Sequence, residues 1–187
     1  MIEVEIRAKV NNFDEIKREL EKIEAKFSET IHQIDKIFGH PMFLDKNNMI
    51  IEGGIVPRIR SVNGKCLLEF KEISRTSGGT ELKSELGSVN LGITFLNKLG
   101  FKEAFTIEKQ RESYKYKDFS IDLDNVDKLG QFVEIEKIVS LSEEKELARE
   151  ECVNLLNIIS QKSKIENKKY GDLMQELINK DNENKST

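Results

Sequence analysis

The chain has 187 residues, of which 37% are hydrophobic and 34% are charged, and it contains no tryptophan. This length suits one well-buried domain. The 30 lysines and arginines nearly balance the 34 aspartates and glutamates, which gives a formal net charge of -4. Such a balance excludes a duplex nucleic-acid surface that works by bulk positive charge, but it leaves a local polyanion site open.

The hydropathy and the cysteine content point to a cytoplasmic protein. The sequence has no run of about eighteen apolar residues and starts with an alternating segment, so we expect neither a membrane span nor a signal peptide. Cys66 and Cys152 lie far apart in the sequence and fit no metal-binding spacing. They are therefore expected to be reduced thiols.

The first part of the chain alternates between strand and helix patterns. Apolar residues at every second position predict a strand, and apolar residues three and four apart predict a helix. The Asn63-Gly64 pair is typical of a tight hairpin turn. We expect, in order, a strand over Met1–Val10, a helix capped by Asn12 or Asp14 and running to about Lys26, a strand over Glu29–Phe38, a long loop over His40–Gly54, and a hairpin of Val56–Val62 and Lys65–Glu72.

The same two periodicities predict the elements of the second part of the chain. The patterns predict a strand over Thr80–Gly87, a helix from Ser88 to Gly100, strands over Lys102–Tyr116, Phe119–Asp124 and Gln131–Val139, a helix opening at Ser142, and a last helix over Tyr170–Ile178. Because short turns join most strands, antiparallel pairing and an α+β class are favoured. We expect one domain over residues 1–178 and a disordered tail over residues 179–187.

Charged residues recur at every second position on strand after strand. These residues are Glu3, Glu5, Arg7 and Lys9, then Arg58 and Arg60, Glu69 and Lys71, Glu81, Lys83 and Glu85, Lys109 and Arg111, Asp122 and Asp124, and Glu134 and Glu136. An open sheet with one solvated face would also alternate, and a purely structural role would follow if these faces pointed to solvent. Such a face normally mixes uncharged polar residues with its charges, however.

If the sheet closes into a barrel with its apolar faces outward against helices, the charged faces line a lumen. Charges that are buried in this way need partners. A triphosphate with divalent cations would supply them, since lysine and arginine neutralise phosphate oxygens and carboxylates ligate Mg²⁺ or Mn²⁺. The pattern therefore favours a triphosphate site.

The ordered set of motifs resembles the CYTH superfamily, the triphosphate tunnel metalloenzymes that include class IV adenylate cyclases and thiamine triphosphatases. The segment Glu3–Arg7 is similar to the family signature ExExK, with arginine where the signature has lysine. Two segments, His32–Phe38 and Ala104–Arg111, are most similar to class IV adenylate cyclases. Similarity extends through Pro57–Arg60, Glu69–Lys71, Lys83–Glu85, Thr106–Arg111, Asp124–Glu136 and Tyr170–Leu173.

This resemblance implies a fold and a set of site residues. The fold would be α+β, with a closed antiparallel eight-stranded β-barrel that forms a tunnel, a charged lumen and surrounding helices. The implied ligands of one or two Mg²⁺ or Mn²⁺ ions are Glu3, Glu5, Asp124, Glu134 and Glu136. The implied phosphate-binding residues are Arg7, Arg58, Arg60, Lys71, Lys83, Lys109 and Arg111. The expected catalytic residues are Glu5, Lys71 and Arg111, whereas Asp122, Glu69 and Glu81 face the same way without an equally clear counterpart.

The resemblance also implies an activity. The favoured one is that of a class IV adenylate cyclase, which converts ATP to cyclic AMP and pyrophosphate. Two alternatives stay open: a triphosphatase acting on tripolyphosphate, thiamine triphosphate or a nucleoside triphosphate, and a non-catalytic polyanion-binding tunnel protein. The expected partner is a small-molecule triphosphate, with no nucleic acid and no membrane, and the amphipathic helices would allow a homodimer.

Overall fold

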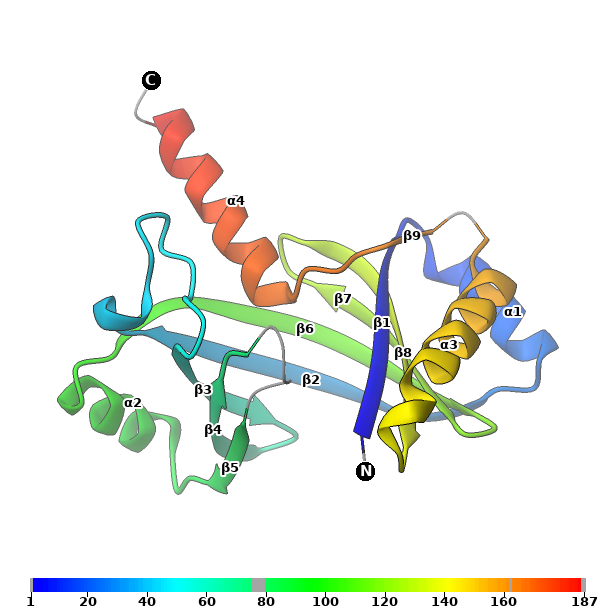
Figure 1. Cartoon of the computed structure of the whole chain (residues 1–187), viewed down its shortest axis with the longest axis horizontal. Coiled ribbons are helices and arrows are strands. Elements are labelled where there is room, and N and C mark those ends of the chain that lie inside the picture. Colours follow the sequence, from blue (N-terminus) through cyan, green and yellow to red (C-terminus); the bar gives the residue numbers. More distant parts are fainter. Residues whose placement is uncertain (1, 75–79, 162, 186–187) are drawn as a thin grey trace. The chain divides into compact units, whose positions relative to one another are not determined.

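The computed structural model describes residues 2–74, 80–161 and 163–185 (Figure 1). Met1 of the first predicted strand and residues 186 and 187 of the predicted tail lie outside the described residues. The strands are β1 (Ile2–Val10), β2 (Lys26–Gly39), β3 (Ile55–Val62), β4 (Lys65–Glu72), β5 (Glu81–Glu85), β6 (Lys102–Tyr116), β7 (Phe119–Val126), β8 (Gly130–Val139) and β9 (Lys164–Ile165). The helices are α1 (Phe13–Lys22), α2 (Val89–Lys98), α3 (Lys145–Ile159) and α4 (Tyr170–Lys185), with short 3₁₀ turns η1 (Pro41–Phe43) and η2 (Ser142–Glu144).

The described strands form one sheet in the order β5-β4-β3-β2-β6-β7-β8-β1-β9. The pairings of β1 with β8, β2 with β3, β3 with β4, β4 with β5, β6 with β7 and β7 with β8 are all antiparallel. The predicted α+β class with a large antiparallel sheet is therefore confirmed. The strand order has two ends, β5 and β9, and it includes the two-residue strand β9, which the sequence analysis did not predict.

The chain divides into two compact units. Unit 1 comprises Met1–Ile31 and Lys109–Asn167, and unit 2 comprises His32–Glu108 and Lys168–Thr187. Both long strands, β2 and β6, contribute one end to each unit. Each unit has a hydrophobic core of its own, and the single domain expected from chain length stays a prediction.

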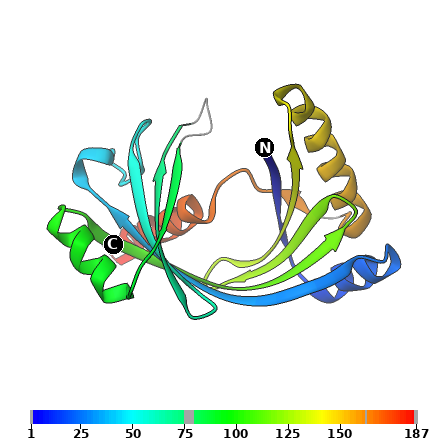
Figure 2. The same cartoon turned by 90° about the horizontal axis from the view of Figure 1, so that it is seen from below.

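In unit 1, helices α1 and α3 cover the apolar face of the strands. Ile6, Ile121 and Ile135 from β1, β7 and β8 pack with Ile16 of α1 and Leu155 of α3, and all five are buried. Figure 2 shows α3 running beside the strands of this unit. Because successive side chains of a strand point to opposite faces, this packing turns the charged residues of the same strands to the other face.

In unit 2, helix α2 packs on the apolar face of β3. Phe38, Ile59 and Leu96 are almost completely buried and form the centre of this core. Gly92 allows the close approach, because a Cβ atom there would lie 2.8 Å from the Cδ1 atom of Ile59. As in unit 1, the helix covers the apolar face and leaves the charged face on the other side.

Two turns follow the sequence signals closely. Asn63 and Gly64 both have positive φ angles, 48° and 75°, as the tight turn between β3 and β4 requires. Gly100 has a φ angle of 89° just after α2, and the N–H of Phe101 donates to the carbonyl of Leu96, which completes a Schellman C-cap.

Helix α1 ends earlier than predicted, at Lys22 instead of Lys26. Glu24 takes a left-handed conformation with a φ angle of 60°, and the N–H of Ala25 donates to the carbonyl of Leu20. This is the same Schellman geometry that Gly100 adopts after α2. Glutamate rarely adopts a left-handed backbone conformation, so nothing in the sequence indicated that α1 ends at Lys22.

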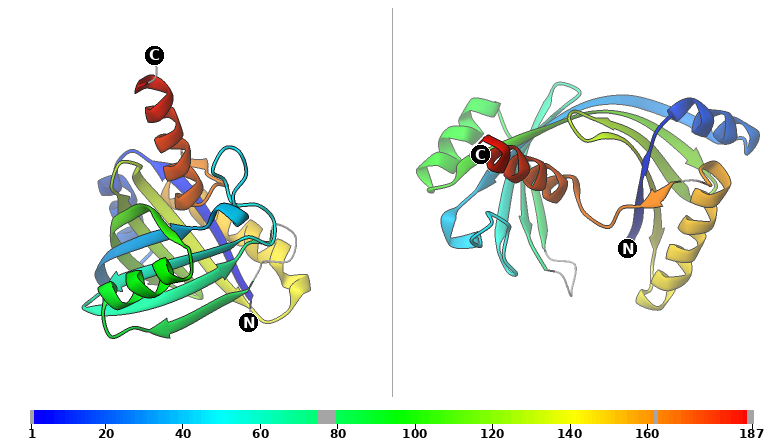
Figure 3. Two further views of the ribbon diagram at one scale, coloured as in Figure 1. Left: turned by 90° about the vertical axis from the view of Figure 1, so that its left-hand side faces the viewer. Right: turned by 90° about the horizontal axis from the view of Figure 1, so that it is seen from above.

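Helix α4 continues to Lys185, so most of the predicted disordered tail is helical. The side chain of Asn179 explains part of the difference, since its Nδ2 donates to the carbonyl of Asn47 at 3.1 Å. The predicted long loop over residues 40–54 contains the 3₁₀ turn η1 and an isolated bridge between Leu44 and Ile50, and Asp45 Oδ1 accepts from the N–H groups of Asn47 and Met49. Figure 3 shows this loop and α4, both parts of unit 2.

None of the described helices is long and apolar enough to cross a membrane.

Candidate functional site

The charged face of unit 1 is built by the register of its strands. Arg111 of β6 lies opposite Asp124 of β7, Asp122 of β7 lies opposite Glu134 of β8, and Glu134 lies opposite Arg7 of β1. Residues that face each other in this way have neighbouring side chains. Antiparallel pairing thus gathers bases and acids from four strands on one face.

Asp124 is the buried centre of this face, with no exposed surface. Its carboxylate accepts two hydrogen bonds from Arg111, both at 2.6 Å, and one from Lys109 at 2.8 Å. Burial opposes ionisation of Asp124, but the hydrogen bond from Arg111 and the charges of Lys109 and Arg111 hold its pKa below the ordinary value. Burial lowers the pKa of Lys109, against the attraction of Asp124.

Glu134 joins two bases from different strands. One of its oxygens accepts from Arg7 Nε at 2.5 Å, and the other contacts Arg111 Nη2. Arg7 also donates to Glu5 Oε1 at 2.7 Å. Arg111 further contacts Asp122 at 2.5 Å, so its guanidinium faces three carboxylates, which raise its pKa against the effect of burial. The guanidinium groups of Arg7 and Arg111 are therefore held in place by acidic neighbours.

A second group of acids lies at one end of the same face. Glu5 is opposite Glu136 in the pairing of β1 with β8. Burial and the charges of Glu3 and Asp122 raise the pKa of Glu136. Neither Glu3 nor Glu136 forms a salt bridge or side-chain hydrogen bond within the described part of the chain. Like charges that lie close together are unfavourable unless a cation neutralises them.

This donor set agrees in kind with a site for Mg²⁺ or Mn²⁺, which prefer carboxylate oxygens. Glu3 and Glu136 fit best and Glu5 lies beside them with one oxygen on Arg7, whereas Asp124 and Glu134 already use their oxygens to hold Arg111, Lys109 and Arg7. Over residues 2–74, 80–161 and 163–185, no three His, Cys, Asp or Glu side chains are close enough together to hold a metal ion. Metal binding at these carboxylates would therefore need their side chains to move closer.

On the charged face of unit 2, as in unit 1, bases pair with buried carboxylates. Asp35 of β2 accepts two hydrogen bonds from Arg60 of β3, at 2.7 and 2.8 Å, and one from Gln33 at 2.9 Å. Glu69 of β4 accepts from Arg60 at 3.2 Å and also contacts Arg58 Nε. Asp35 and Glu69 are both buried, with 5% and 2% of their surface exposed, so they hold the two arginines firmly.

The open end of this face belongs to β4 and β5. Glu81 lies 3.2 Å from Arg58, 3.5 Å from Lys83 and 3.9 Å from Lys71. Burial opposes ionisation of Glu81, but the charges of Lys83, Lys71 and Arg58 lower its pKa. Burial and the nearby Lys169 lower the pKa of Lys71.

The structure brings together most of the residues that the sequence indicated. In unit 1 these are Glu5, Arg7, Lys109, Arg111, Asp124 and Glu134, with Glu3 and Glu136 at one end of the face. In unit 2 they are Arg58, Arg60, Lys71 and Lys83. Their roles toward metal and phosphate stay predictions.

Sequence reasoning missed four acids and one base of these faces. Asp122, Glu69 and Glu81 were given no role, although they shared the strand parity of the assigned residues. Asp35 lies in the segment His32–Phe38, and its alternation with Gln33 could have placed it on the charged face. Lys169 lies outside the strands, so periodicity carried no signal for it.

The bases of each face could exchange their carboxylate partners for a ligand. Phosphate oxygens accept the same bidentate hydrogen bonds from arginine as carboxylates do. A polyphosphate could therefore replace Asp124 or Glu134 as a partner of Arg111 and Arg7. The carboxylates that lose their bases would then need cations, which divalent metals supply.

Comparison with known proteins agrees with this geometry. The sequence profile of the CYTH domain matches residues 1–170. A Methanocaldococcus jannaschii protein named "Putative adenylate cyclase MJ0240" is 33% identical over 179 residues, covering 92% of this chain and 98% of the relative.

Two solved structures illustrate the likeness in fold. The PH1819 protein of Pyrococcus horikoshii has a TM-score of 0.75 and 28% identity, covering 94% of this chain and 99% of its own. A Hippeastrum protein named "Putative adenylyl cyclase HpAC1", which is described as having a dominant triphosphatase activity, has a TM-score of 0.66 and 14% identity, covering 94% of this chain and 96% of its own. The profile match spans most of the sequence and both structural units, and the chain belongs to the CYTH family.

Proposed function

We propose that this chain is a divalent-metal-dependent enzyme that acts on a triphosphate, and that it converts ATP to cyclic AMP and pyrophosphate. One observation carries the proposal: buried carboxylates hold three bases on the charged face of unit 1, Arg7, Lys109 and Arg111, and two on that of unit 2, Arg58 and Arg60. Such bases are positioned before a ligand arrives, which reduces the entropy lost on binding. The closed eight-stranded tunnel implied by the resemblance stays a prediction.

The arginines and lysines would bind and neutralise the phosphates. Arg7, Lys109 and Arg111 in unit 1 and Arg58 and Arg60 in unit 2 present donors in fixed directions. In the proposed reaction, the ribose 3′ oxygen forms a bond to the α-phosphorus and the bond to the pyrophosphate oxygen breaks. Donors on the leaving pyrophosphate stabilise the negative charge that develops on it.

The carboxylates would hold the metal ion. Glu3, Glu5 and Glu136 would be the first ligands, and Asp124 and Glu134 would join them once their bases bind phosphate. A bound Mg²⁺ or Mn²⁺ would lower the pKa of the attacking hydroxyl and neutralise phosphate charge. Arg7 links the two groups of acids, because it contacts both Glu5 and Glu134.

Lys71 is the proposed proton acceptor. Burial and the adjacent Lys169 lower its pKa, so it is neutral at a lower pH than an exposed lysine. The proton of the 3′ hydroxyl would pass to Lys71 as the new bond to phosphorus forms.

The test is a product analysis with ATP, thiamine triphosphate and inorganic tripolyphosphate, each with Mg²⁺, Mn²⁺ or a chelator. Cyclic AMP and pyrophosphate from ATP would support the cyclase. Orthophosphate from any of the three would show a triphosphatase on the same residues. Binding of tripolyphosphate without any product would show a polyanion receptor and overturn the enzymatic proposal.

A matched pair of variants strengthens this test. Glu5→Gln removes a proposed metal ligand, whereas Glu103→Gln removes an acid that pairs with Lys36 in unit 2. Glu5→Gln is expected to abolish metal-dependent turnover, and Glu103→Gln is expected to leave it unchanged. Wild-type turnover by the Glu5 variant would remove Glu5 from the metal site.

A further inference from the structure

A row of side chains crosses the charged face of unit 1 at its acidic end. Lys115 of β6 lies opposite Ser120 of β7. Ser120 in turn lies opposite Glu136 of β8, and Glu136 lies opposite Glu5 of β1. Because residues directly opposite each other point to the same face of a sheet, Lys115 is a base on the face of the proposed metal ligands. The sequence analysis gave it no role.

Lys115 is held by a hydroxyl group and not by a carboxylate. Its Nζ donates a hydrogen bond to Ser120 Oγ. Over residues 2–74, 80–161 and 163–185, no carboxylate forms a salt bridge with it. The bases assigned to this face above, Arg7, Lys109 and Arg111, all contact carboxylates. Lys115 therefore differs from them in the kind of partner that it has.

The hydrogen bond to Ser120 keeps the ammonium group near the acids without occupying their oxygens. Strand β7 lies between β6 and β8, so the hydroxyl of Ser120 holds the ammonium group one strand away from Glu136. The charge of Lys115 still acts on Glu136. Burial and the charge of Glu3 raise the pKa of Glu136, and the charge of Lys115 opposes them. Part of the negative charge is thus offset while the carboxylate oxygens stay available to a cation.

This arrangement has opposite effects with and without a metal ion. Without metal, the ammonium group reduces the repulsion among Glu3, Glu5 and Glu136. A divalent cation held by these three carboxylates would lie near the same ammonium group, and like charges repel each other. Metal binding at the acidic end therefore works against the charge of Lys115.

We propose that Lys115, held by Ser120, is an internal counter-charge of the metal site and limits how tightly its carboxylates bind Mg²⁺ or Mn²⁺. The inference rests on the proposed function, because it concerns the metal site assigned there, and it adds a residue that determines metal affinity. Lys115 contacts neither the metal nor the reacting atoms in this role. Metal binding itself, measured without substrate, is therefore the direct test.

Removing the charge and removing its anchor should have opposite effects. Lys115 is exposed, so solvent and salt screen its charge. We expect Lys115→Gln to tighten Mn²⁺ binding by about two- to fivefold, as fits one screened charge. Ser120→Ala releases the ammonium group to pair with Glu136, so Mn²⁺ has to displace it and binding should weaken. The double variant should behave like Lys115→Gln, because the hydroxyl acts only through the lysine.

The experiment is a titration of the full chain with Mn²⁺ alone, in which electron paramagnetic resonance measures the free ion. Wild type, Lys115→Gln, Ser120→Ala and the double variant are compared, with circular dichroism to show that each is folded. The gain in Lys115→Gln should shrink between about 0.1 M and about 1 M potassium chloride, because the screening length falls from about 10 Å to about 3 Å.

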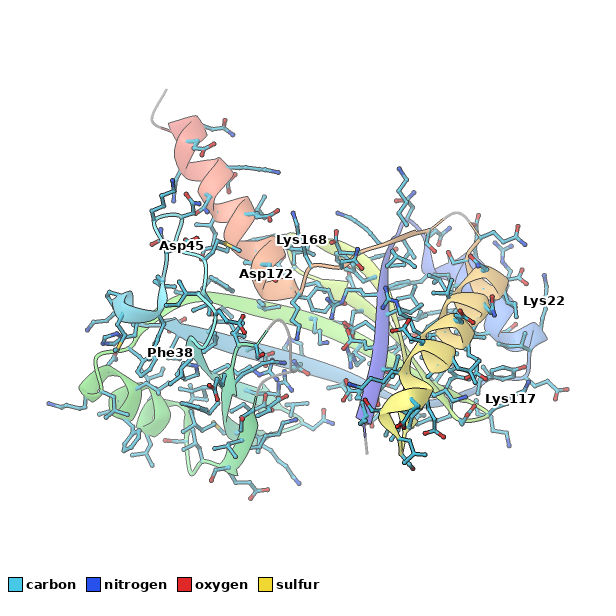
Figure 4. The ribbon with its side chains drawn as sticks, viewed as in Figure 1. Lys22, Phe38, Asp45, Lys117, Lys168 and Asp172 are labelled. Carbon is cyan, nitrogen blue, oxygen red and sulfur yellow. The ribbon has the colours of Figure 1, made fainter. Side chains whose placement is uncertain are left out.

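The matched control is Lys117→Gln, which removes the same charge from the same hairpin. Figure 4 labels Lys117, which belongs to the turn between β6 and β7. Its Nζ lies 4.9 Å from the centre of the Tyr116 ring, and the side chain has no contact with Ser120 among the described residues. We expect Lys117→Gln to bind Mn²⁺ as wild type does.

Three results would contradict a claim. Unchanged or weaker Mn²⁺ binding in Lys115→Gln, while Glu136→Gln weakens binding, would reject the inference and leave the proposed metal site intact. Equal tightening in Lys117→Gln would show that only the general charge of the hairpin matters, which also rejects the inference. Wild-type Mn²⁺ binding in both Glu5→Gln and Glu136→Gln would instead reject the metal site of the proposed function, and the inference with it.

Discussion

At the scale of single residues, Asp124 is the most consequential buried charge. It has no exposed surface and neutralises both Arg111 and Lys109. Replacing it with asparagine would leave two partly buried cations without their main partner. We expect Asp124→Asn to lower the free energy of unfolding by about 3 kcal/mol or more, measured by urea denaturation. The control is Glu108→Gln, which breaks a pair with His32 that is half exposed and should cost less than about 1 kcal/mol.

The same carboxylate predicts a pH dependence of stability. The folded pKa of Asp124 lies below its ordinary value. Its contribution is therefore fully present above the unfolded pKa of about 3.9 and is lost as the pH falls through the folded value. Asp124→Asn should lack this part of the acid destabilisation. Equal pH dependence of wild type and variant from about pH 5 to pH 2 would contradict the assignment.

Lys71 allows a direct test of its electrostatic surroundings. Burial and Lys169 lower its pKa, Arg58 acts in the same direction, and Glu81 opposes them. Lys169→Gln should therefore move the titration of Lys71 to higher pH, whereas Glu81→Gln should move it to lower pH. The measurement is carbon NMR of reductively methylated lysines, with Lys71→Arg to assign the signal. An unchanged titration in both variants would show that Lys71 does not contact these groups in solution.

At the scale of elements, the packing of α2 depends on Gly92. A Cβ atom there would lie 2.7 Å from Leu86 Cδ1 and 2.8 Å from Ile59 Cδ1, in a core where Ile59 is 1% exposed. Alanine favours the helix by about 1 kcal/mol, but overpacking costs about 1 to 3 kcal/mol. We expect Gly92→Ala to lower the free energy of unfolding. Gly171→Ala in α4 is the matched control, since nothing lies within 4 Å of its Cβ position, and it should be neutral or stabilising. Equal stabilities of the two variants would contradict the packing of α2.

The elements also show what a sequence can and cannot predict here. Strand parity placed Arg111, Asp124 and Glu134 on one face, because a period of two fixes the side to which a side chain points. Parity does not determine which acid pairs with which base across neighbouring strands. That Glu134 bridges Arg7 and Arg111 follows only from the register of four strands, β1, β8, β7 and β6.

Other features depend on contacts between distant segments. Helix α4 was expected to end at Ile178, but Asn179 contacts Asn47, far away in the sequence. Lys169 meets Lys71 for the same reason, since both segments belong to unit 2. Local sequence patterns cannot predict such contacts between distant segments. The positive φ angle of Glu24 could not be predicted either, because glycine and asparagine are the residues typical of that conformation and neither stands there.

At the scale of the whole molecule, the near-equal numbers of acids and bases acquire a specific meaning. Both units pair these charges on a face opposite a helix-covered core, in place of spreading them over solvent-facing strands. A polyphosphate alone would displace carboxylates from their bases and leave them without partners. A divalent cation alone would find Glu5, Asp124 and Glu134 already holding arginine or lysine, beside Glu3 and Glu136. Each ligand therefore improves the site for the other, which is thermodynamic linkage.

This linkage gives the last prediction. The melting temperature of the chain should rise more with tripolyphosphate and Mg²⁺ together than the sum of the two separate shifts. Mg²⁺ also binds tripolyphosphate in solution, so the comparison uses Glu5→Gln, in which that solution complex is the same. The variant should keep the shift caused by tripolyphosphate alone, because Arg111 and Lys109 keep their positions, and should lose the extra shift. Additive shifts in the wild type, or an undiminished extra shift in the variant, would show that the carboxylates of β1 do not bind the metal.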